Sequence, residues 1–398
     1  MKERQKQMEA DKAHLAALRR EFHRYPELGM QEFRTAQRIE EELDKLGIPR
    51  TRIGKTGVLG TIRGKGTGNR VVVLRADIDA LPIFETTGAE YCSEVPGVMH
   101  ACGHDAHITC LLGAAKLLAE QRESFGGEAR LVFQPGEEIG KGAEDFVKAG
   151  VLENADRVFG LHVASELPIG TVGLKPGLNN AAVDQFKITV RGKSAHVSTP
   201  QLGVDALYIA SQIMVAFQAL VTRRTAAVEP VIIGVGKLNA GTTYNAVAET
   251  AVLEGTTRTI SAKMRGQVRA LMEKTVQNTA DIYGGKAEIE WVDVASALIN
   301  DPEVCLEAEK AAEKLFEKYG IVNGRVMRDR PLSLSGDNFS EFLLRTKGAY
   351  AYLGSGNPAL PNTQSPGHNG NFDIDEDALV LGAGLYAEYA VSQLQGVS

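Results

Sequence analysis

Residues that commonly bind metal ions are concentrated in the short stretch His100–His107, which reads HACGHDAH. Cys102 and His104 are two positions apart with a glycine between them, so in an extended or turning chain their side chains project to the same side and can share a metal ion. The alternative is a polar loop that contains one buried thiol. The number of ligand-type residues so soon after a buried strand favours a metal site.

Two adjacent carboxylates, Glu137 and Glu138, follow a predicted strand at 129–133. Adjacent side chains point in different directions, so one can bind a metal ion while the other faces a bound water. Beside a cation a carboxylate stays ionised and can take a proton from that water. The alternative is a solvated acidic turn that starts a helix, where glutamate suits the helix dipole.

Two further histidines stand at element ends: His162 directly after a predicted strand at 157–161, and His368 in a loop before the C-terminal helix. Alone, each fits an ordinary hydrogen-bonded histidine. Taken together, the cysteine, histidine and glutamate side chains are too many for one tetrahedral structural site. Five ligands with open positions suit two metal ions that activate a water for attack on a carbonyl. Asp77 could orient a ligand histidine, or cap the end of its strand.

The elements that must position these residues alternate between strand and helix. Strands are predicted at 58–62, 71–74, 129–133 and 157–161, with a helix at 109–120. Such alternation indicates an α/β domain whose mostly parallel sheet is covered by helices. Ligands of open α/β sheets gather at the carboxyl ends of the strands. The glycine-rich segment 64–68 is predicted to be a hairpin turn.

The pattern changes near residue 183, where Phe186, Ile188 and Val190 alternate with polar residues. The predicted order from there is strand, helix, two strands, helix and strand, which is the ferredoxin-like α+β arrangement. We therefore predict an inserted domain at 183–296. The catalytic domain would then be discontinuous and built from 1–182 and 297–398.

The composition is that of an ordinary soluble globular protein. The 398 residues are 43% hydrophobic and 24% charged, with a net charge of -6. A nucleic-acid partner would call for a basic face, and no run of lysine and arginine suggests one. The polar N-terminus does not resemble a signal peptide, and the apolar stretch 378–391 is too short for a membrane span. Four cysteines without a CxxC pair fit a reducing compartment, so we expect a cytoplasmic protein.

Several motifs in order resemble one known family over nearly the whole chain. They are Arg19–Leu28 (RREFHRYPEL), Arg75–Pro82 (RADIDALP), Met99–His107 (MHACGHDAH), Gln134–Glu138 (QPGEE) and Gly160–His162 (GLH). Together they resemble the aminoacylase and carboxypeptidase family of dinuclear metallohydrolases, within it the hippurate hydrolase and auxin-conjugate hydrolase branch. The resemblance implies hydrolysis of a small N-acyl amino acid to a carboxylate and a free amino acid.

The resemblance also implies roles for individual residues. Two divalent ions (Mn, Zn, Ni or Co) would be bound, with Cys102 bridging them and Glu137 as the general base. Asp77 would support the ligands without binding metal. The implied metal ligands are Cys102, His104, Glu138, His162 and His368.

Three residues of the inserted domain match positions with family roles. His196 would reach the active site of a partner subunit and polarise the scissile carbonyl. Asn245 and Arg258 would hold the substrate carboxylate, to which a guanidinium donates two parallel hydrogen bonds. A homodimer is therefore expected, with a tetramer or a self-sufficient monomer as alternatives.

Three other functions remain open at this stage. The same fold could serve a dipeptidase or aminopeptidase. Cys102 and His104 could form the nucleophile and base of a cysteine hydrolase. A binding protein could also retain the fold without catalysis.

Overall fold

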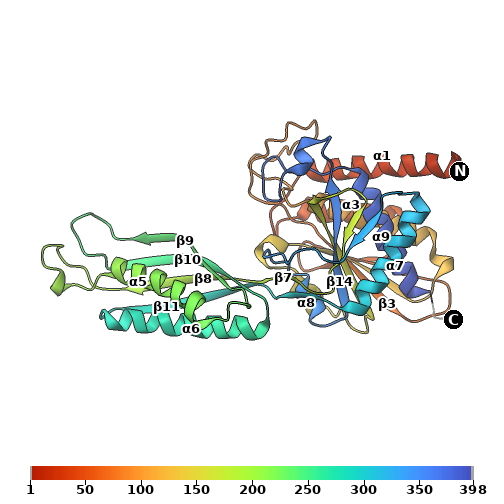
Figure 1. Ribbon diagram of the computed structural model, residues 1–398. Helices are drawn as coiled ribbons and strands as arrows, with labels where there is room; N and C mark the ends of the chain where they lie inside the picture. Colours follow the sequence, from red (N-terminus) through yellow and green to blue (C-terminus); the bar gives the residue numbers. More distant parts are fainter. Residues whose placement is uncertain (1, 396–398) are drawn as a thin grey trace. The chain divides into compact units, whose positions relative to one another are not determined.

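The computed structural model of the protein describes residues 2–395 (Figure 1). The chain forms two compact units, each made from segments distant in sequence. The larger comprises Met1–Asn179, Ile299–Pro331 and Asn338–Ser398, and the smaller comprises Asn180–Leu298 and Leu332–Asp337.

An eight-stranded sheet forms the centre of the larger unit, in the order β1-β2-β4-β3-β5-β14-β6-β13. Its strands β4, β3, β5 and β14 run parallel to one another, and β2 pairs antiparallel with β4. The predicted mostly parallel sheet is thus confirmed. The strands are β1 (Arg50–Ile53), β2 (Gly57–Arg63), β3 (Val71–Asp77), β4 (Glu128–Gln134), β5 (Arg157–Pro168), β6 (Thr171–Gly173), β13 (Arg325–Met327) and β14 (Gly348–Gly356).

Helices cover this sheet in layers. All seven residues of β3 are buried, and α3 and α9 both contact it, while α1 packs on α3 and α9 and α7 packs on α9 and β14 (Figure 1). The helix α9 is buried along nearly its whole length, as expected of a core helix. The helices are α1 (Lys2–Arg24), α2 (Phe33–Lys45), α3 (His104–Glu120), α4 (Ala143–Lys148), α7 (Pro302–Tyr319), α8 (Ser340–Leu343) and α9 (Asp377–Leu394).

Two predictions about local structure were wrong. Residues 64–68 do not form a hairpin turn, because β4 lies between β2 and β3 and pairs with both. The helix expected at 109–120 begins earlier, at His104. Its first turns are buried on every side, so they lack the polar and apolar alternation that marks a surface helix.

The smaller unit has the predicted ferredoxin-like order. Its four strands form an antiparallel sheet in the order β11-β8-β10-β9, covered by α5 and α6. Asp205 caps α5 by accepting the backbone N–H groups of Leu207 and Tyr208. The elements are β8 (Ala182–Arg191), α5 (Ala206–Ala219), β9 (Ile232–Ala240), β10 (Thr250–Thr259), α6 (Ala262–Ile282) and β11 (Lys286–Ala295); β7 (Gly177–Asn180) and β12 (Leu298–Asn300) form a separate two-stranded sheet.

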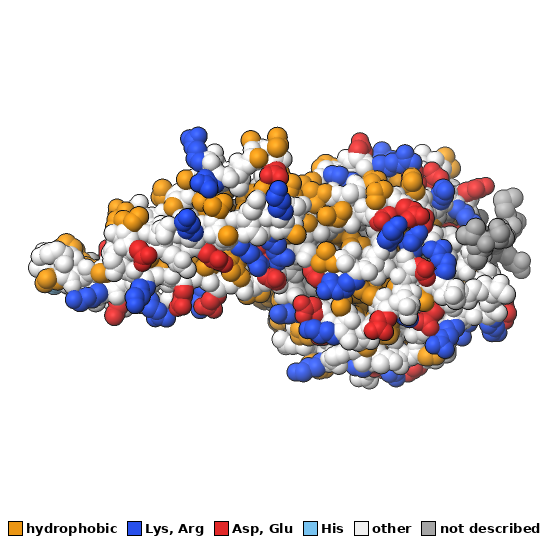
Figure 2. Space-filling model, turned by 90° about the horizontal axis from the view of Figure 1, so that it is seen from below, with side chains coloured by type: hydrophobic (Ala, Val, Ile, Leu, Met, Phe, Trp, Pro, Cys, Tyr) orange, Lys and Arg blue, Asp and Glu red, His pale blue; other side chains and the backbone are white. Residues whose placement is uncertain are grey.

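One described helical stretch, Ala206–Arg224, is long and apolar enough by composition to cross a membrane. It combines α5 with a π-helical turn, and its side chains Ile209, Ile213 and Phe217 belong to the core of the smaller unit. A helix that covers a sheet passes the same test of length and composition, so this finding is weak support for a membrane span. On the face seen in Figure 2, basic and acidic side chains are interspersed.

Candidate metal centre

The candidate site forms where the neighbouring parallel strands β3 and β4 end, beside the middle of β5. The prediction that His162 directly follows its strand was wrong, because pairing with β14 continues β5 to Pro168. The strands β4, β3 and β5 are adjacent, and Asp77 at the end of β3 pairs with Gln134 at the end of β4. On the other side Arg75 pairs with Gly160, which places His162 level with Asp77. Because the strands are parallel, the carboxyl ends of β3 and β4 share one edge of the sheet, and the residues that follow them converge there with His162 of β5.

A glycine turn brings Cys102 and His104 to this edge. Gly103 has φ 84°, and a Cβ atom there would lie 2.3 Å from Val163 Cγ2, so both the backbone conformation and the space require glycine. The turn directly precedes α3, whose first residue is His104. Cys102 Sγ consequently lies 3.3 Å from His162 Nε2.

His104 has one ring nitrogen held and the other available. Its Nδ1 lies 2.8 Å from the carbonyl oxygen of Asp79 and donates to it. Its Nε2 is buried and makes no hydrogen bond. A histidine that binds metal through one nitrogen usually donates its other N–H to such a partner. The orphaned Nε2 therefore fits a metal ion.

His162 follows the same rule, whereas His107 does not. His162 Nδ1 lies 2.6 Å from Val163 O, and its Nε2 faces Cys102. Both ring nitrogens of His107 are hydrogen-bonded within the protein. Its Nδ1 lies 2.5 Å from Asp77 Oδ1, and its Nε2 accepts the N–H of Val163 at 2.9 Å. His107 therefore connects Asp77 to the strand that carries His162 and has no nitrogen left for a metal ion.

Glu138 and His368 complete the set. Glu138 Oε1 lies 3.3 Å from His368 Nε2 and 3.9 Å from His104 Nε2. His368 has φ 63°, rare for a residue with a side chain, and its N–H donates to Ala101 O at 2.8 Å. This bond ties the late loop of the chain to the residue just before Cys102.

The five predicted ligands thus meet in two overlapping groups. Cys102, His104 and His162 form one, and Cys102, Glu138 and His368 form the other, with the ligand atoms of each group within 4.8 Å of one another. Cys102 belongs to both groups. Two cations that share a thiolate fit this arrangement, and a Cys/His/carboxylate set accepts several first-row metals.

The pKa values of the proposed ligands shift in different directions. Burial lowers the pKa of His104, but the Asp77 carboxylate outweighs burial and raises it well above its usual value. Burial lowers the pKa of His162 well below its usual value, so the imidazole is neutral and can bind metal. Burial and the nearby Glu138 carboxylate raise the pKa of the Cys102 thiol well above its usual value. A divalent cation in contact with the sulfur would offset the effects of burial and of Glu138 on Cys102 and favour its thiolate.

Glu137 lies beside both ligand groups. One of its carboxylate oxygens, one Glu138 oxygen and a His104 nitrogen lie within 4.8 Å of one another. Glu137 Oε1 accepts the backbone N–H of Asn338 at 3.2 Å. The side chain is therefore held at the edge of the site, as a base acting on a water there requires.

Sequence reasoning missed Asp79, which orders the site most directly. Its carboxylate accepts the backbone N–H groups of both Glu137 and Glu138 at 3.0 Å, and its carbonyl holds His104. A signal was present, because Asp77 and Asp79 alternate in the same motif and therefore share a direction. Glu32 supports the same turn by accepting the N–H of Gly136 at 2.9 Å.

The three predicted substrate-contacting residues lie in the smaller unit, and only two of them are neighbours. His196 pairs with Ala246 in an antiparallel bridge, next to Asn245. Arg258 lies near the far end of β10, where its Nε donates to Leu334 O at 2.8 Å. Asn245 precedes β10, which begins at Thr250. Arg258 lies 8 residues beyond Thr250 on this strand, about 26 Å at the usual rise per residue.

Comparisons with known proteins identify the family of this chain. Residues 73–392 match the model of Peptidase family M20/M25/M40. The chain is 39% identical to N-acetyl-L-cysteine deacetylase of Bacillus subtilis, covering 92% of this chain and 85% of that protein. It is 38% identical to thermostable carboxypeptidase 1 of Saccharolobus solfataricus, covering 94% of each.

A solved structure is similar over nearly the full length. The Bacillus subtilis YXEP protein, described as a dinuclear metal binding peptidase from M20 family, superposes with a TM-score of 0.81. The two sequences are 32% identical, and the match covers 97% of this chain and 99% of that one.

The contacts of Asp77 generate a prediction about metal affinity. Asp77→Asn removes the charge that orients His107 and pairs with Arg75 Nη1 at 2.6 Å. We expect metal affinity to fall about 10-fold, the lower end of the range for residues that orient ligands, because Asp77 acts on His162 through His107 and the N–H of Val163. Competition with a chelating dye measures it. Asp156→Asn is the control, since Asp156 only accepts the N–H of Val71 at the opposite end of β3; equal effects of the two substitutions would contradict the prediction.

Proposed function

The chain belongs to peptidase family M20/M25/M40, and we propose that it is a dinuclear-metal amidohydrolase that cleaves N-acylated amino acids into a carboxylate and a free amino acid. The observation that carries the proposal is the pair of overlapping ligand groups sharing Cys102, with Glu137 beside them. The name of the related N-acetyl-L-cysteine deacetylase supports an acyl amino acid as the substrate class.

The ligands of the two ions would be Cys102, His104, Glu138, His162 and His368. Two bound divalent ions would supply a Lewis acid for the carbonyl and lower the pKa of an attacking water. Glu137 takes the proton of that water and delivers it to the leaving amine. Its hydrogen bond from Asn338 keeps the carboxylate in place during both transfers.

His196 is suited to stabilise the developing oxyanion. Its Nδ1 accepts the backbone N–H of Ser198 at 3.1 Å. In the neutral ring the proton then resides on Nε2, which becomes a donor. The His196 side chain is exposed, so this donor can reach a carbonyl oxygen of a bound substrate.

The separation of Asn245 from Arg258 supports a homodimer. A small substrate cannot contact both residues of one subunit. Asn245 precedes the first residue of β10, and Arg258 lies about 26 Å further along the strand. Both can hold one substrate carboxylate if one residue comes from each subunit. Exposed apolar side chains on α5 and β9, among them Val215 and Ile232, offer surface for such an association.

We also propose a cytoplasmic location. Cys92, Cys102, Cys110 and Cys305 are free thiols. Free thiols in this number are typical of a reducing compartment.

A peptidase of the same fold is the second candidate. It is favoured by the similarity to a protein named thermostable carboxypeptidase 1. Rates on N-acetyl or N-benzoyl amino acids compared with rates on free dipeptides distinguish the two candidates. A marked preference for dipeptides would favour the peptidase.

Glu137→Gln should retain metal and lose turnover. The amide cannot accept the proton of water, and general acid–base catalysis contributes about 10²- to 10⁴-fold. We expect kcat to fall by such a factor, with unchanged metal content by elemental analysis. Glu144→Gln is the control, because Glu144 lies on α4 and pairs only with Lys148 at the surface. Near wild-type turnover in the Glu137 variant would remove this residue from its role.

Metal removal should abolish activity. Dialysis against a chelator takes away the groups that polarise the carbonyl, and adding back Mn, Zn, Ni or Co salts should restore turnover. Initial rates before and after reconstitution give the answer. Turnover that resists chelation but stops on thiol alkylation would instead favour a cysteine nucleophile at Cys102.

Mixed dimers test whether His196 acts across the subunit interface. His196→Ala and Glu137→Gln homodimers should each be nearly inactive. If His196 serves the partner's site, each mixed dimer contains one site with both native residues and regains up to half of the wild-type activity. Co-expression with two affinity tags isolates the mixed species. Mixed dimers as inactive as the parents would show that both residues act within one subunit.

A further inference from the structure

The N-terminal helix α1 carries a buried arginine that has no part in the proposed reaction. Arg19 has no exposed surface. Its Nε lies 2.7 Å from Asp105 Oδ2, its Nη2 2.8 Å from Asp373 Oδ1, and its Nη1 3.5 Å from Glu376 Oε1. The guanidinium therefore bridges acids from two segments that are far apart in the sequence.

One helical turn later, His23 extends the same cluster. Its Nδ1 lies 2.7 Å from Asp105 Oδ2, the oxygen that Arg19 also contacts, and its Nε2 lies 3.2 Å from Glu85 Oε1. The next residue after Glu85, Thr86, donates its N–H to Gly370 O at 2.7 Å. A third segment is thereby joined to the loop that contains His368.

The acids in this cluster neighbour the metal ligands. Asp105 directly follows His104 and lies in the first turn of α3. Asp373 lies five residues after His368. A displacement of either acid would move the backbone that carries one ligand of the metal centre.

We propose that Arg19 and His23 are positioning residues that hold the His104 and His368 segments at the spacing the two metal ions need. This inference rests on the proposed function, since it takes those two histidines as ligands. The RREFH motif of α1 would then support metal binding by holding the segments that carry two ligands. Neither Arg19 nor His23 would contact metal or substrate.

Helix packing alone does not account for this cluster. Leu15, Leu18 and Phe22 on α1 are buried in the main core and attach the helix by themselves. A buried ion pair adds little stability over apolar residues of similar volume, because its charges lose their hydration. Asp105 Oδ2 accepts from both Arg19 Nε and His23 Nδ1, so a single carboxylate oxygen joins the two side chains to the first turn of α3.

The decisive variant is Arg19→Met, which keeps the side-chain length and removes the bridge. Zn²⁺ titrated into the metal-free full-length chain, in competition with a chelating dye, measures affinity. We expect affinity for at least one ion to fall about 10- to 100-fold. With both sites loaded at excess Zn²⁺, kcat should fall more than KM changes, because the ligands remain displaced while the substrate contacts lie elsewhere.

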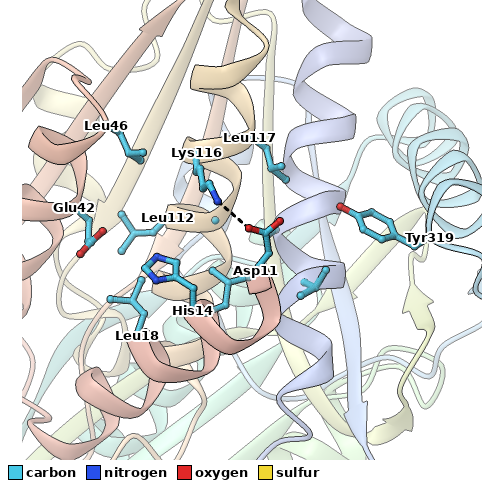
Figure 3. Close-up of a pocket in the computed structure, with 13 residues that line it drawn as sticks. Asp11, His14, Leu18, Glu42, Leu46, Leu112, Lys116, Leu117 and Tyr319 are labelled. Atoms are coloured by element: carbon cyan, nitrogen blue, oxygen red, sulfur yellow. Dashed lines mark hydrogen bonds and ion pairs between the residues drawn. The ribbon is translucent and has the colours of Figure 1, made fainter. Parts of the chain in front are cut away.

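Two controls separate positioning from stability. Leu18→Ala removes packing from the same helix, where Leu18 lines a hollow with Leu112 and Leu117 (Figure 3). Asp11→Asn breaks another ion pair between α1 and α3, the 2.8 Å contact of Asp11 with Lys116 (Figure 3). Lys116 lies twelve residues beyond His104. Both controls should retain wild-type Zn²⁺ affinity even where the unfolding temperature falls.

Arg19→Lys provides a second test by the same Zn²⁺ titration, and this test remains valid if Arg19→Met does not fold. The ammonium keeps the buried charge but cannot present the planar fork that reaches two acids. Intermediate Zn²⁺ affinity supports positioning. Wild-type affinity in either folded Arg19 variant, with only a lower unfolding temperature, overturns it. Failure of the unmodified chain to bind Zn²⁺ or to hydrolyse acyl amino acids would instead overturn the proposed function.

Discussion

The hydrogen-bond register between β4, β3 and β5 fixes which side chains can meet at the carboxyl edge of the large sheet. Asp77 pairs with Gln134 on one side, and His162 lies level with it on the other. Shifting any of these strands by one residue would turn its side chains to the opposite face. The ligand cluster therefore depends on a register that the buried β-branched residues of β3 stabilise.

Around this edge, hydrogen bonds decide which atoms are available for metal. Asp79 fixes the ring of His104 through its carbonyl and the Glu137–Glu138 turn through its carboxylate. His107 shows the converse, because both of its nitrogens are occupied by the protein. A buried nitrogen without a hydrogen-bond partner, such as His104 Nε2, is therefore available to a metal ion, whereas the hydrogen-bonded nitrogens of His107 are not.

The residues of the proposed reaction lie in two units with different sheets. The parallel sheet of the larger unit brings the proposed ligands and base together at one edge, the side on which open α/β sheets bind their ligands. The antiparallel sheet of the smaller unit separates His196 and Asn245 from Arg258 along β10. If, as we propose, all three residues contact one small substrate, this separation requires that they come from two chains.

From the sequence, the ligand types and both sheet types could be predicted, because residue type and periodicity are local properties. The position of His162 inside β5, and not after it, could not, because pairing with β14 extends that strand. The meeting of Cys102 with His368, and the bonds from Asp79, required the tertiary structure, since no local pattern states which loops touch. The sequence likewise misassigned residues 64–68, because only long-range pairing places β4 between β2 and β3. Local physics determined the elements and the ligand chemistry, and long-range hydrogen bonding decided their arrangement.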